Sequence, residues 1–170
     1  MPTVYVNIGS NIGNRRSVLE RAVACIKGRW CNVRVSGVVE SEPWGYDSPN
    51  SFLNVGVAFE CDSESSPLDV HRELQYIQNS ICGDSHRTDG GVYVDRVIDI
   101  DLIAIDSEIV DSKELQLPHP RMHMREFVLV PMMELASGWV HPVFGLTCAK
   151  MLAKVSKSSV SVSYDSILMD

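Results

Sequence analysis

The segment from Arg96 to Ile103, RVIDIDLI, constrains the fold more than any other stretch of the chain. Its β-branched residues favour a strand, and alternate side chains of a strand point to opposite faces. The even-numbered residues of the segment that follow Arg96 are apolar, whereas Asp99 and Asp101 lie on the opposite face. A fold built on this strand therefore needs an apolar layer on one side and a means of neutralising two carboxylates on the other.

The two aspartates predict a cation site if their strand face lines a cavity. Cα atoms two residues apart on a strand are about 6.5–7 Å apart. Asp99 and Asp101 can therefore converge on one cation or hold two side by side. Carboxylate oxygens that leave room for water and phosphate suit Mg2+. The alternative is an edge strand with two solvated aspartates, and the segment alone leaves both interpretations open.

Composition limits the class of protein and its partners. The 170 residues are 45% apolar and 22% charged, which is typical of a single globular domain, here expected to span residues 1–170. A net charge of −7 argues against a nucleic-acid partner. Five scattered cysteines without a C-x-x-C pair argue against a disulfide framework or zinc site. With no leader-like N-terminus and no long apolar run, we expect a cytoplasmic protein without a membrane partner.

Hydrophobic periodicity predicts elements in the order β-α-β-β-α-β, followed by a helical C-terminal addition. Asn14 is expected to cap the first helix and Gly83 to end the second. The order predicts an α+β fold with a ferredoxin-like core, in which helices pack on one face of an antiparallel-rich sheet. Strands are expected at residues 4–8, 33–40, 52–60 and 96–103, with short ones at 108–110 and 160–164, and helices at 15–27, 67–82, within 122–136 and at 147–155.

Cationic and imidazole side chains flank the aspartates in the sequence. Arg96 precedes them, and His119, Arg121 and Arg125 follow. Arginine binds phosphate oxygens bidentately, and phosphoryl-type transfer needs mainly positioning and neutralisation of charge. Together with Mg2+, this set indicates an enzyme that acts on a nucleotide. His119, held between two prolines, either contacts phosphate or makes a structural hydrogen bond.

Four further features have two interpretations each. The glycine-bearing loop at residues 9–14 is either a phosphate cradle or a tight turn. Trp44 is either a lid over a flat ligand or a plug that covers the core from outside. Asn54 either ties down a loop or reads the polar edge of a heterocycle, because a buried amide needs partners. His71 lies on the apolar stripe of a helix, where a satisfied packing residue is favoured over a ligand.

Four ordered motifs carry a family resemblance: GSN with a following glycine (9–13), PWG with FLN (43–54), RVIDIDL (96–102) and LPHPR with REFVLVP (117–131). Over about residues 3–142 the chain resembles the 6-hydroxymethyl-7,8-dihydropterin pyrophosphokinase family. That family transfers a pyrophosphoryl group from ATP to the pterin hydroxymethyl oxygen, giving AMP, in folate biosynthesis. The resemblance implies a ferredoxin-like core, small-molecule substrates and a monomer.

The resemblance also implies roles for individual residues. Asp99 and Asp101 would hold two Mg2+ ions, with Asp99 also orienting the pterin hydroxyl, and Arg96, His119 and Arg125 would contact the transferring phosphates. Phe127 would stack on the pterin together with either Trp44 or Phe52. The implied pterin-binding residues are Gly9, Ser41, Glu42, Trp44, Phe52, Asn54, Asp99 and Phe127, and the implied ATP-binding residues are Gln75, Gln78, His86, Arg87, Arg96, His119, Arg121 and Arg125.

The chain departs from the family pattern between the second helix and the aspartate strand. The usual G-R-x-R reads GDSHR at residues 83–87, a usual glutamate on the helix is Gln78, and the usual Trp-Gly-Pro before the arginine reads YVD at residues 93–95. These changes remove cations near the phosphates. We therefore expect an active enzyme whose contacts from this loop differ from the usual ones.

Overall fold

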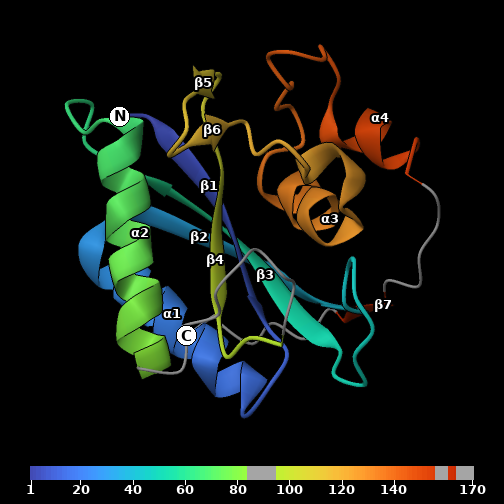
Figure 1. The fold of residues 1–170 in the computed structure, drawn as a ribbon. Coiled ribbons are helices and arrows are strands. Elements are labelled where there is room, and N and C mark those ends of the chain that lie inside the picture. The colour runs from blue at the N-terminus through green and yellow to red at the C-terminus, as the bar shows by residue number, and fades with distance from the viewer. Residues whose placement is uncertain (84–94, 156–160, 164–170) are drawn as a thin grey trace.

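The structure, a computed structural model, describes residues 1–83 and 95–155 and the backbone of residues 161–163 (Figure 1). The ATP-binding prediction for His86 and Arg87 lies outside the described residues. The predicted core order β-α-β-β-α-β is confirmed, whereas the short strand at Gln116–Leu117 was not predicted. The elements are β1 (Thr3–Ser10), α1 (Arg15–Arg29), β2 (Cys31–Ser41), β3 (Phe52–Glu60), α2 (Pro67–Cys82), β4 (Asp99–Ile105), β5 (Val110–Asp111), β6 (Gln116–Leu117), the 3-10 helix η2 (Met122–Met124), α3 (Glu126–Leu135), α4 (Cys148–Leu152) and β7 (Ser161–Ser163).

The main sheet has the strand order β4-β1-β3-β2-β7, and each pair of neighbours is antiparallel. Strands β1 and β2 consequently run parallel to one another with β3 between them, and β3 and β4 likewise enclose β1. This is the split β-α-β arrangement of a ferredoxin-like core, so the predicted fold class is confirmed. Strands β5 and β6 form a separate two-stranded sheet.

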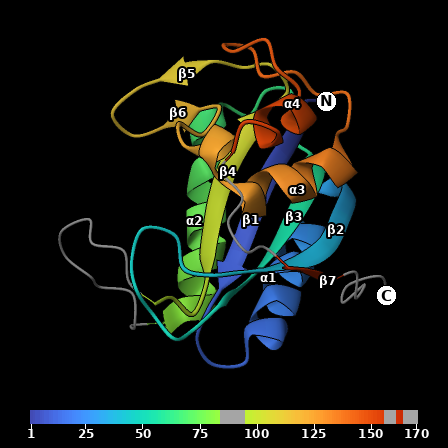
Figure 2. The ribbon, with the colours of Figure 1, turned by 90° about the vertical axis from the view of Figure 1, so that its right-hand side faces the viewer.

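Helices cover both faces of the main sheet, so the expectation that they pack on one face was wrong (Figures 1 and 2). One core joins α1 and α2 to the face that carries Ile98, Ile100 and Leu102. A second core joins α3 and α4 to the opposite face through Tyr5 and Ile103. The near-continuous apolar runs of β1 and β3 are typical of strands that are buried on both sides, and this signal predicts two helical layers.

Local signals set the ends of the helices as predicted. The Asn14 side chain accepts a hydrogen bond from the Ser17 backbone, 3.1 Å, and so caps α1. Ser66 and Asp69 form a capping box at the start of α2. Gly83 ends α2 with a φ of 60°, a conformation that glycine adopts at little cost.

Helix α3 covers only one end of its face of the sheet. Its close approach depends on Gly56 in β3, because a Cβ atom there would lie 2.6 Å from the Pro131 Cβ atom of α3. The residues that α3 and α4 bury come from the start of β1 and the later parts of β3 and β4. The other end of this face, which carries Gly9, Asn54 and Asp99, is left to line a cavity. Among the described residues, no helix is long and apolar enough to cross a membrane.

Candidate active site

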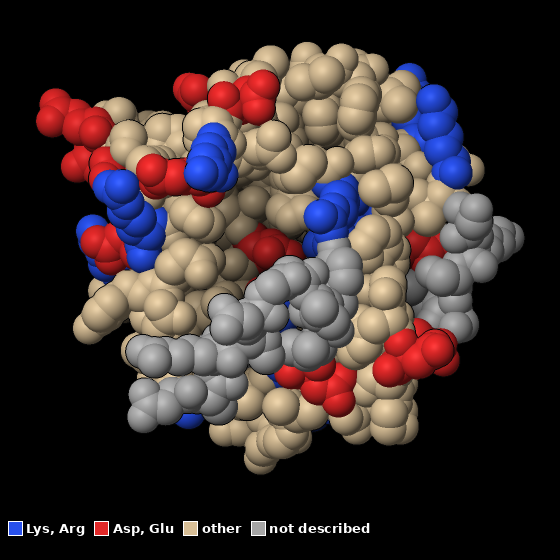
Figure 3. Space-filling view, in the orientation of Figure 1, with Lys and Arg blue, Asp and Glu red and all other residues tan. Residues whose placement is uncertain are grey.

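A cavity of about 250 Å3 opens on the face of the sheet that α3 leaves uncovered. Figure 3 shows this hollow, with acidic atoms at its floor and basic side chains beside it. We call it the first cavity. It brings together every predicted pterin-binding and catalytic residue, and its lining is Asn7, Gly9, Ser41, Glu42, Trp44, Tyr46, Phe52, Asn54, Arg96, Asp99, Asp101, His119, Pro120, Arg121, Arg125 and Phe127.

Asp99 and Asp101 lie on the edge strand β4, yet they are only partly exposed. Their side chains are only 29% and 27% exposed, and both line the cavity. Burial, together with the neighbouring charge of Asp101, raises the pKa of Asp99 to about 6. Burial also raises the pKa of Asp101. The alternative of two solvated edge aspartates was therefore wrong.

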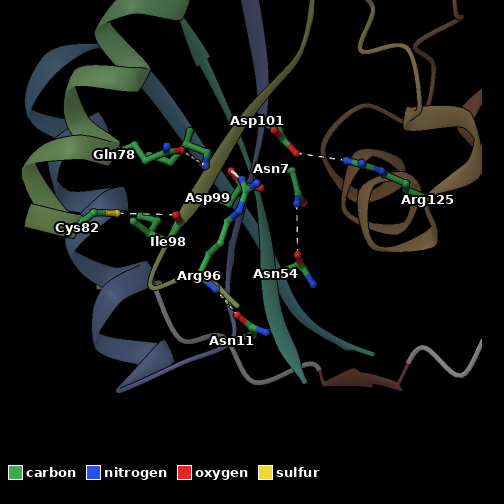
Figure 4. Close-up of polar contacts among 11 residues, drawn as sticks. Asn7, Asn11, Asn54, Gln78, Cys82, Arg96, Ile98, Asp99, Asp101 and Arg125 are labelled. Atoms are coloured by element: carbon green, nitrogen blue, oxygen red, sulfur yellow. Dashed lines mark hydrogen bonds and ion pairs between the residues drawn. The ribbon is translucent and has the colours of Figure 1, made fainter. Parts of the chain in front are cut away.

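Two arginines face the aspartates and neutralise them only in part (Figure 4). Arg96 Nη1 donates to Asp99 Oδ1 over 2.7 Å, and Arg125 Nη1 lies 3.4 Å from Asp101 Oδ2. Burial, and for Asp99 also the charge of Asp101, raises both pKa values in spite of these attractions. The pair favours a further positive charge in the cavity.

The donor set fits Mg2+. The described residues contain no cluster of three or more His, Cys, Asp or Glu side chains. The protein side of the cavity therefore offers the carboxylate oxygens of Asp99 and Asp101. The remaining coordination positions would belong to water and to a phosphate-bearing ligand, which is how Mg2+ is commonly held.

The outer edge of β4 is fixed by two hydrogen bonds from outside the sheet. Gln78 Oε1 accepts from the Ile100 backbone over 2.7 Å, and the His119 backbone donates to the Ile103 carbonyl over 2.7 Å. These bonds satisfy edge groups that would otherwise be unpaired. The Gln78 side chain thus binds the backbone of Ile100, the residue between the two aspartates. It does not line the first cavity or the second cavity described below.

His119 makes the structural hydrogen bond that was one of its two predicted interpretations, and contact with phosphate stays a prediction. Its Nδ1 accepts a hydrogen bond from the Arg121 backbone, 3.1 Å, so the ring is held in place. Burial and the nearby Arg125 charge lower the pKa of His119 to about 4. The ring is therefore neutral at pH 7 and, with Nδ1 accepting, carries its proton on Nε2. It offers a phosphate an N–H group and no positive charge.

The end of the cavity beyond the aspartates is built to hold an amide in place. Asn54 is 2% exposed, and its Nδ2 donates to Ser41 Oγ over 2.8 Å. Its Oδ1 lies 3.4 Å from Asn7 Nδ2, and Figure 4 shows Asn7 directed toward it. Gly9 makes room, because a Cβ atom there would lie 2.9 Å from Asn54 Oδ1. Asn54 is tied to its neighbours, in agreement with the first interpretation. It also lines the cavity, and recognition of a heterocycle there stays a prediction.

Aromatic side chains form the wall near Arg125. The Arg125 guanidinium carbon lies 4.8 Å from the Trp44 ring centre and 5.6 Å from the Phe127 ring centre. Trp44 is 36% exposed and lines the cavity, so the prediction that it plugs the core was wrong. Phe52 also lines the cavity, and the choice between Trp44 and Phe52 as the second stacking partner stays open.

A second cavity, of about 390 Å3, adjoins the first. The two share Asp101, His119 and Pro120, and the second lies between α2 and the segment that contains β5 and β6. Gln75 lines this second cavity, as does His71. The buried His71 Nδ1 has no hydrogen-bond partner among the described residues, so the predicted hydrogen-bond partner of this packing histidine is not seen there.

Sequence reasoning missed Asn7 and Tyr46, which line the first cavity. A signal for Asn7 was present, because it lies two residues before Gly9 on the same strand face. In the sheet, Asn7 is paired with Asp101 and Gly9 with Asp99. Tyr46 carried no comparable signal, because its place depends on how the loop between β2 and β3 folds over the sheet.

Comparison with known proteins gives relatives that agree with one another. The family model described as 7,8-dihydro-6-hydroxymethylpterin-pyrophosphokinase (HPPK) matches residues 5–137. The chain is 41% identical over 144 residues to the 2-amino-4-hydroxy-6-hydroxymethyldihydropteridine pyrophosphokinase of Porphyromonas gingivalis, covering 84% of this chain and 95% of that protein. It is 32% identical over 155 residues to the Folic acid synthesis protein fol1 of Pneumocystis carinii, covering 89% of this chain and 20% of that protein.

Among solved structures, the fold resembles the crystal structure of Plasmodium falciparum HPPK-DHPS with SDX-DHP. The TM-score is 0.67 at 13% sequence identity, over 91% of this chain and 43% of that chain. The present chain thus spans less than half the length of that solved chain. At this identity the likeness concerns the fold alone.

Proposed function

The chain belongs to the 7,8-dihydro-6-hydroxymethylpterin-pyrophosphokinase (HPPK) family, and from this premise we propose how it carries out that family's reaction. It is a pyrophosphokinase of folate biosynthesis that transfers pyrophosphate from ATP to the hydroxymethyl oxygen of 6-hydroxymethyl-7,8-dihydropterin and leaves AMP. Asp99 and Asp101 hold two Mg2+ ions, and the pterin lies in the first cavity. The observation that carries this assignment is that the carboxylate pair and the Asn54 amide line one cavity.

The two cavities divide the substrates between them. The first has aromatic rings and a fixed amide, which suit a flat heterocycle with polar edges. The second contains Gln75 and would take the nucleoside part of ATP. Because the cavities share Asp101 and His119, the ATP phosphates would lie at the junction, next to the pterin hydroxymethyl group. Two observations support ATP as the second substrate, namely the arrangement of the two cavities and the membership of the family.

The residues at the junction each contribute a separate part of the catalysis. When bound, Mg2+ would neutralise phosphate charge and polarise the bond that breaks. Asp99, next to the first cavity, would also orient the hydroxymethyl O–H. Arg96 and Arg125 would balance negative charge on the transferring group, and the His119 Nε2–H would donate to a phosphate oxygen. Transfer joins the β-phosphorus of ATP to the hydroxymethyl oxygen and breaks its bond to the α-phosphate oxygen, with the hydroxyl proton lost to solvent.

Two broader properties are part of the same proposal. None of the five cysteines, all of which lie in the described part of the chain, forms a disulfide, and Cys25 and Cys31 are exposed, which suits the reducing environment of the cytoplasm. The second property is the monomeric state that the family resemblance implies.

The reaction is tested by measuring AMP release from ATP and Mg2+ with and without 6-hydroxymethyl-7,8-dihydropterin. We expect AMP to form only when the pterin is present, in equal amount with the pyrophosphorylated pterin. Tight pterin binding without AMP would identify a binding protein that has lost catalysis. Inorganic phosphate released without pterin would identify a phosphohydrolase.

A further inference from the structure

Asp95 accepts a network of hydrogen bonds, and the reaction described above gives this residue no role. Its Oδ1 accepts from Asn11 Nδ2 over 2.7 Å and from the Tyr46 hydroxyl over 3.1 Å. Its Oδ2 accepts from Asn50 Nδ2 over 2.6 Å. Hydrogen bonds from the side chains of Ser48 and Asn50 hold the pKa of Asp95 below its ordinary value. One carboxylate therefore gathers donors from the loop between β2 and β3 and from the end of β1.

One arm of this network reaches the metal side of the site through Asn11. Asn11 Oδ1 accepts from the Arg96 backbone over 2.7 Å, and the Asn11 backbone donates to the Arg96 carbonyl over 3.1 Å. Arg96 Nη1 in turn donates to Asp99 Oδ1 over 2.7 Å. Figure 4 shows Asn11 at the backbone of Arg96, with Asp99 near its guanidinium. Because Asp95 binds the Asn11 amide nitrogen, it orients the amide oxygen toward Arg96.

The other arm reaches the pterin side of the site. Tyr46 and Asn50 belong to the loop that also carries Trp44, and both Tyr46 and Trp44 line the first cavity. Asn11 Nδ2 adds bonds to the Tyr46 hydroxyl, 3.1 Å, and to the Asn50 carbonyl, 3.2 Å. Asp95 itself does not line either cavity. It can therefore affect the reaction only through the groups that it holds.

We propose that Asp95 is a positioning residue. It holds residues 42–51, which we call the covering loop, and the phosphate-contacting Arg96 in fixed positions relative to each other. This inference rests on the proposed function and deepens it. An unbroken path of hydrogen bonds leads from the covering loop through Asp95, Asn11 and Arg96 to Asp99. Catalysis by positioning is sensitive to small displacements, because a shift of about 1 Å in a reacting group can cost about a hundredfold in rate. Proline, which the resemblance places at this position, has no side-chain acceptor and could not hold these donors.

The first test is the Asp95→Asn variant, which keeps the shape of the side chain. Its amide replaces one acceptor oxygen with a donor, so at least one of the Asn11 and Asn50 amides must lose its bond. We expect kcat to fall about tenfold and the KM for pterin to rise about tenfold. The matched control is Asp62→Asn, because Asp62 accepts a backbone hydrogen bond within a turn remote from the cavities. Wild-type kcat and KM in Asp95→Asn would overturn the proposal.

Two double-mutant cycles separate positioning from a general structural role. In an Arg96→Lys background, Asp95→Asn should lower kcat no more than about twofold further, because the group it acts through is already altered. In a Tyr46→Phe background, which lacks the hydroxyl, Asp95→Asn should raise the pterin KM by a smaller factor than in wild type. Multiplicative effects in both cycles would overturn the proposal, because they mean that Asp95 acts independently of both groups.

Hydrogen exchange tests the same coupling without turnover. In the ligand-free protein, Asp95→Asn should speed amide exchange both in residues 42–51 and at Arg96, whose backbone N–H is held by Asn11. Asn50→Ser, which removes one loop donor, should speed exchange in the loop alone and serves as the second variant. Unchanged exchange at Arg96 in Asp95→Asn would overturn the coupling even if the enzyme were active. A wild-type protein that fails to make AMP would instead refute the proposed function and leave the exchange result interpretable.

Discussion

The two faces of the main sheet are made by the same strands and differ in what covers them. On the face of α1 and α2, apolar side chains are buried almost completely, as with Leu19 and Ile98 at 0% exposure. Trp30 stacks on Phe59 there at 4.3 Å between ring centres. We call this the closed face. On the opposite face, which we call the open face, α3 covers one end, and the other end carries Asp99 and Asp101.

The difference shows that the closed face adds to the stability of the fold, whereas the open face lowers it. Apolar burial on the closed face stabilises the protein and needs no ligand. On the open face, burial raises the pKa values of both aspartates. Their charged forms therefore lower the free energy of unfolding of the ligand-free protein. Substitutions on the two faces should therefore have opposite signatures, with stability lost on the closed face and turnover lost on the open face.

The largest effect is expected on the open face. Replacing Asp101 with Asn keeps the shape of the side chain and removes the charge that would hold Mg2+. We expect kcat to fall about a thousandfold, because a lost metal ligand removes several kcal/mol of transition-state stabilisation. Steady-state AMP release measures this, with the melting temperature as the control for folding. A kcat within tenfold of wild type would contradict the assignment of the metal site to the open face.

The closed face should show the reverse. Leu19→Ala leaves a cavity between α1 and the sheet, and Leu19 lines neither ligand cavity. We expect the free energy of unfolding to fall by about 3 kcal/mol, with kcat per folded molecule unchanged. Urea unfolding and active-site titration measure the two quantities. A large loss of kcat at unchanged stability would show that the two faces are not functionally distinct.

The pH dependence of stability sharpens the same contrast. The pKa of Asp99 is about 6 in the folded protein and 3.8 ordinarily, so the folded state keeps a proton that the unfolded chain releases. Stability from this group is therefore present at low pH and lost as the pH rises from about 4 to about 6. Ligand-free Asp99→Asn should be more stable than wild type at pH 8 by about 2–3 kcal/mol, with the gap closing near pH 4.

Because His119 also titrates, the informative quantity is the difference in stability between wild type and Asp99→Asn at each pH. The pH dependence of wild-type stability alone mixes the two groups. The folded pKa of His119, about 4, lies below its ordinary 6.5, so its contribution falls as the pH drops through that range. This is the opposite sign to Asp99. The Asp99 charge also raises the pKa of His119, so the two proteins differ in this contribution at low pH, whereas at pH 8 His119 is neutral in both. Equal stability of Asp99→Asn and wild type at pH 8 would contradict the prediction.

The smallest effect concerns the aromatic wall. Trp44→Ala should weaken pterin binding by about 0.5–1.5 kcal/mol beyond the loss of buried area, if the ring stacks on the pterin. Calorimetric titration measures it, and Phe144→Ala is the control, because Phe144 is exposed and lines neither cavity. Pterin affinity unchanged by Trp44→Ala would remove Trp44 from the stacking pair and leave Phe52.

Much of this contrast can be read from the sequence. The period of two at residues 96–103 assigned Ile98 and Ile100 to one face and the aspartates to the other, and the β-α-β-β-α-β order fixed the strand arrangement. These signals are local, so a single segment contains them. Residues from each of the four ordered segments line one cavity, as the resemblance implied.

The contacts that hold the site together could not be read in the same way. The Asn11–Asp95 bond joins residues 84 positions apart, and Gln78 reaches the Ile100 backbone from another element. Such pairs depend on how loops and helices settle on the finished sheet, for which the sequence has no period. The apolar runs of β1 and β3 signalled that the second face is covered, but the close approach of α3 depends on a glycine and a proline in separate elements, Gly56 and Pro131.

The central claim is that the open face uses Asp99 and Asp101 to hold divalent cations beneath a nucleotide. The most direct measurement is electron paramagnetic resonance of Mn2+, titrated into the protein with a non-transferable ATP analogue and the pterin. Wild type should immobilise two Mn2+ ions per chain, whereas the Asp99→Asn, Asp101→Asn double variant should bind no more than the analogue alone does. Equal Mn2+ binding by both proteins would contradict the account.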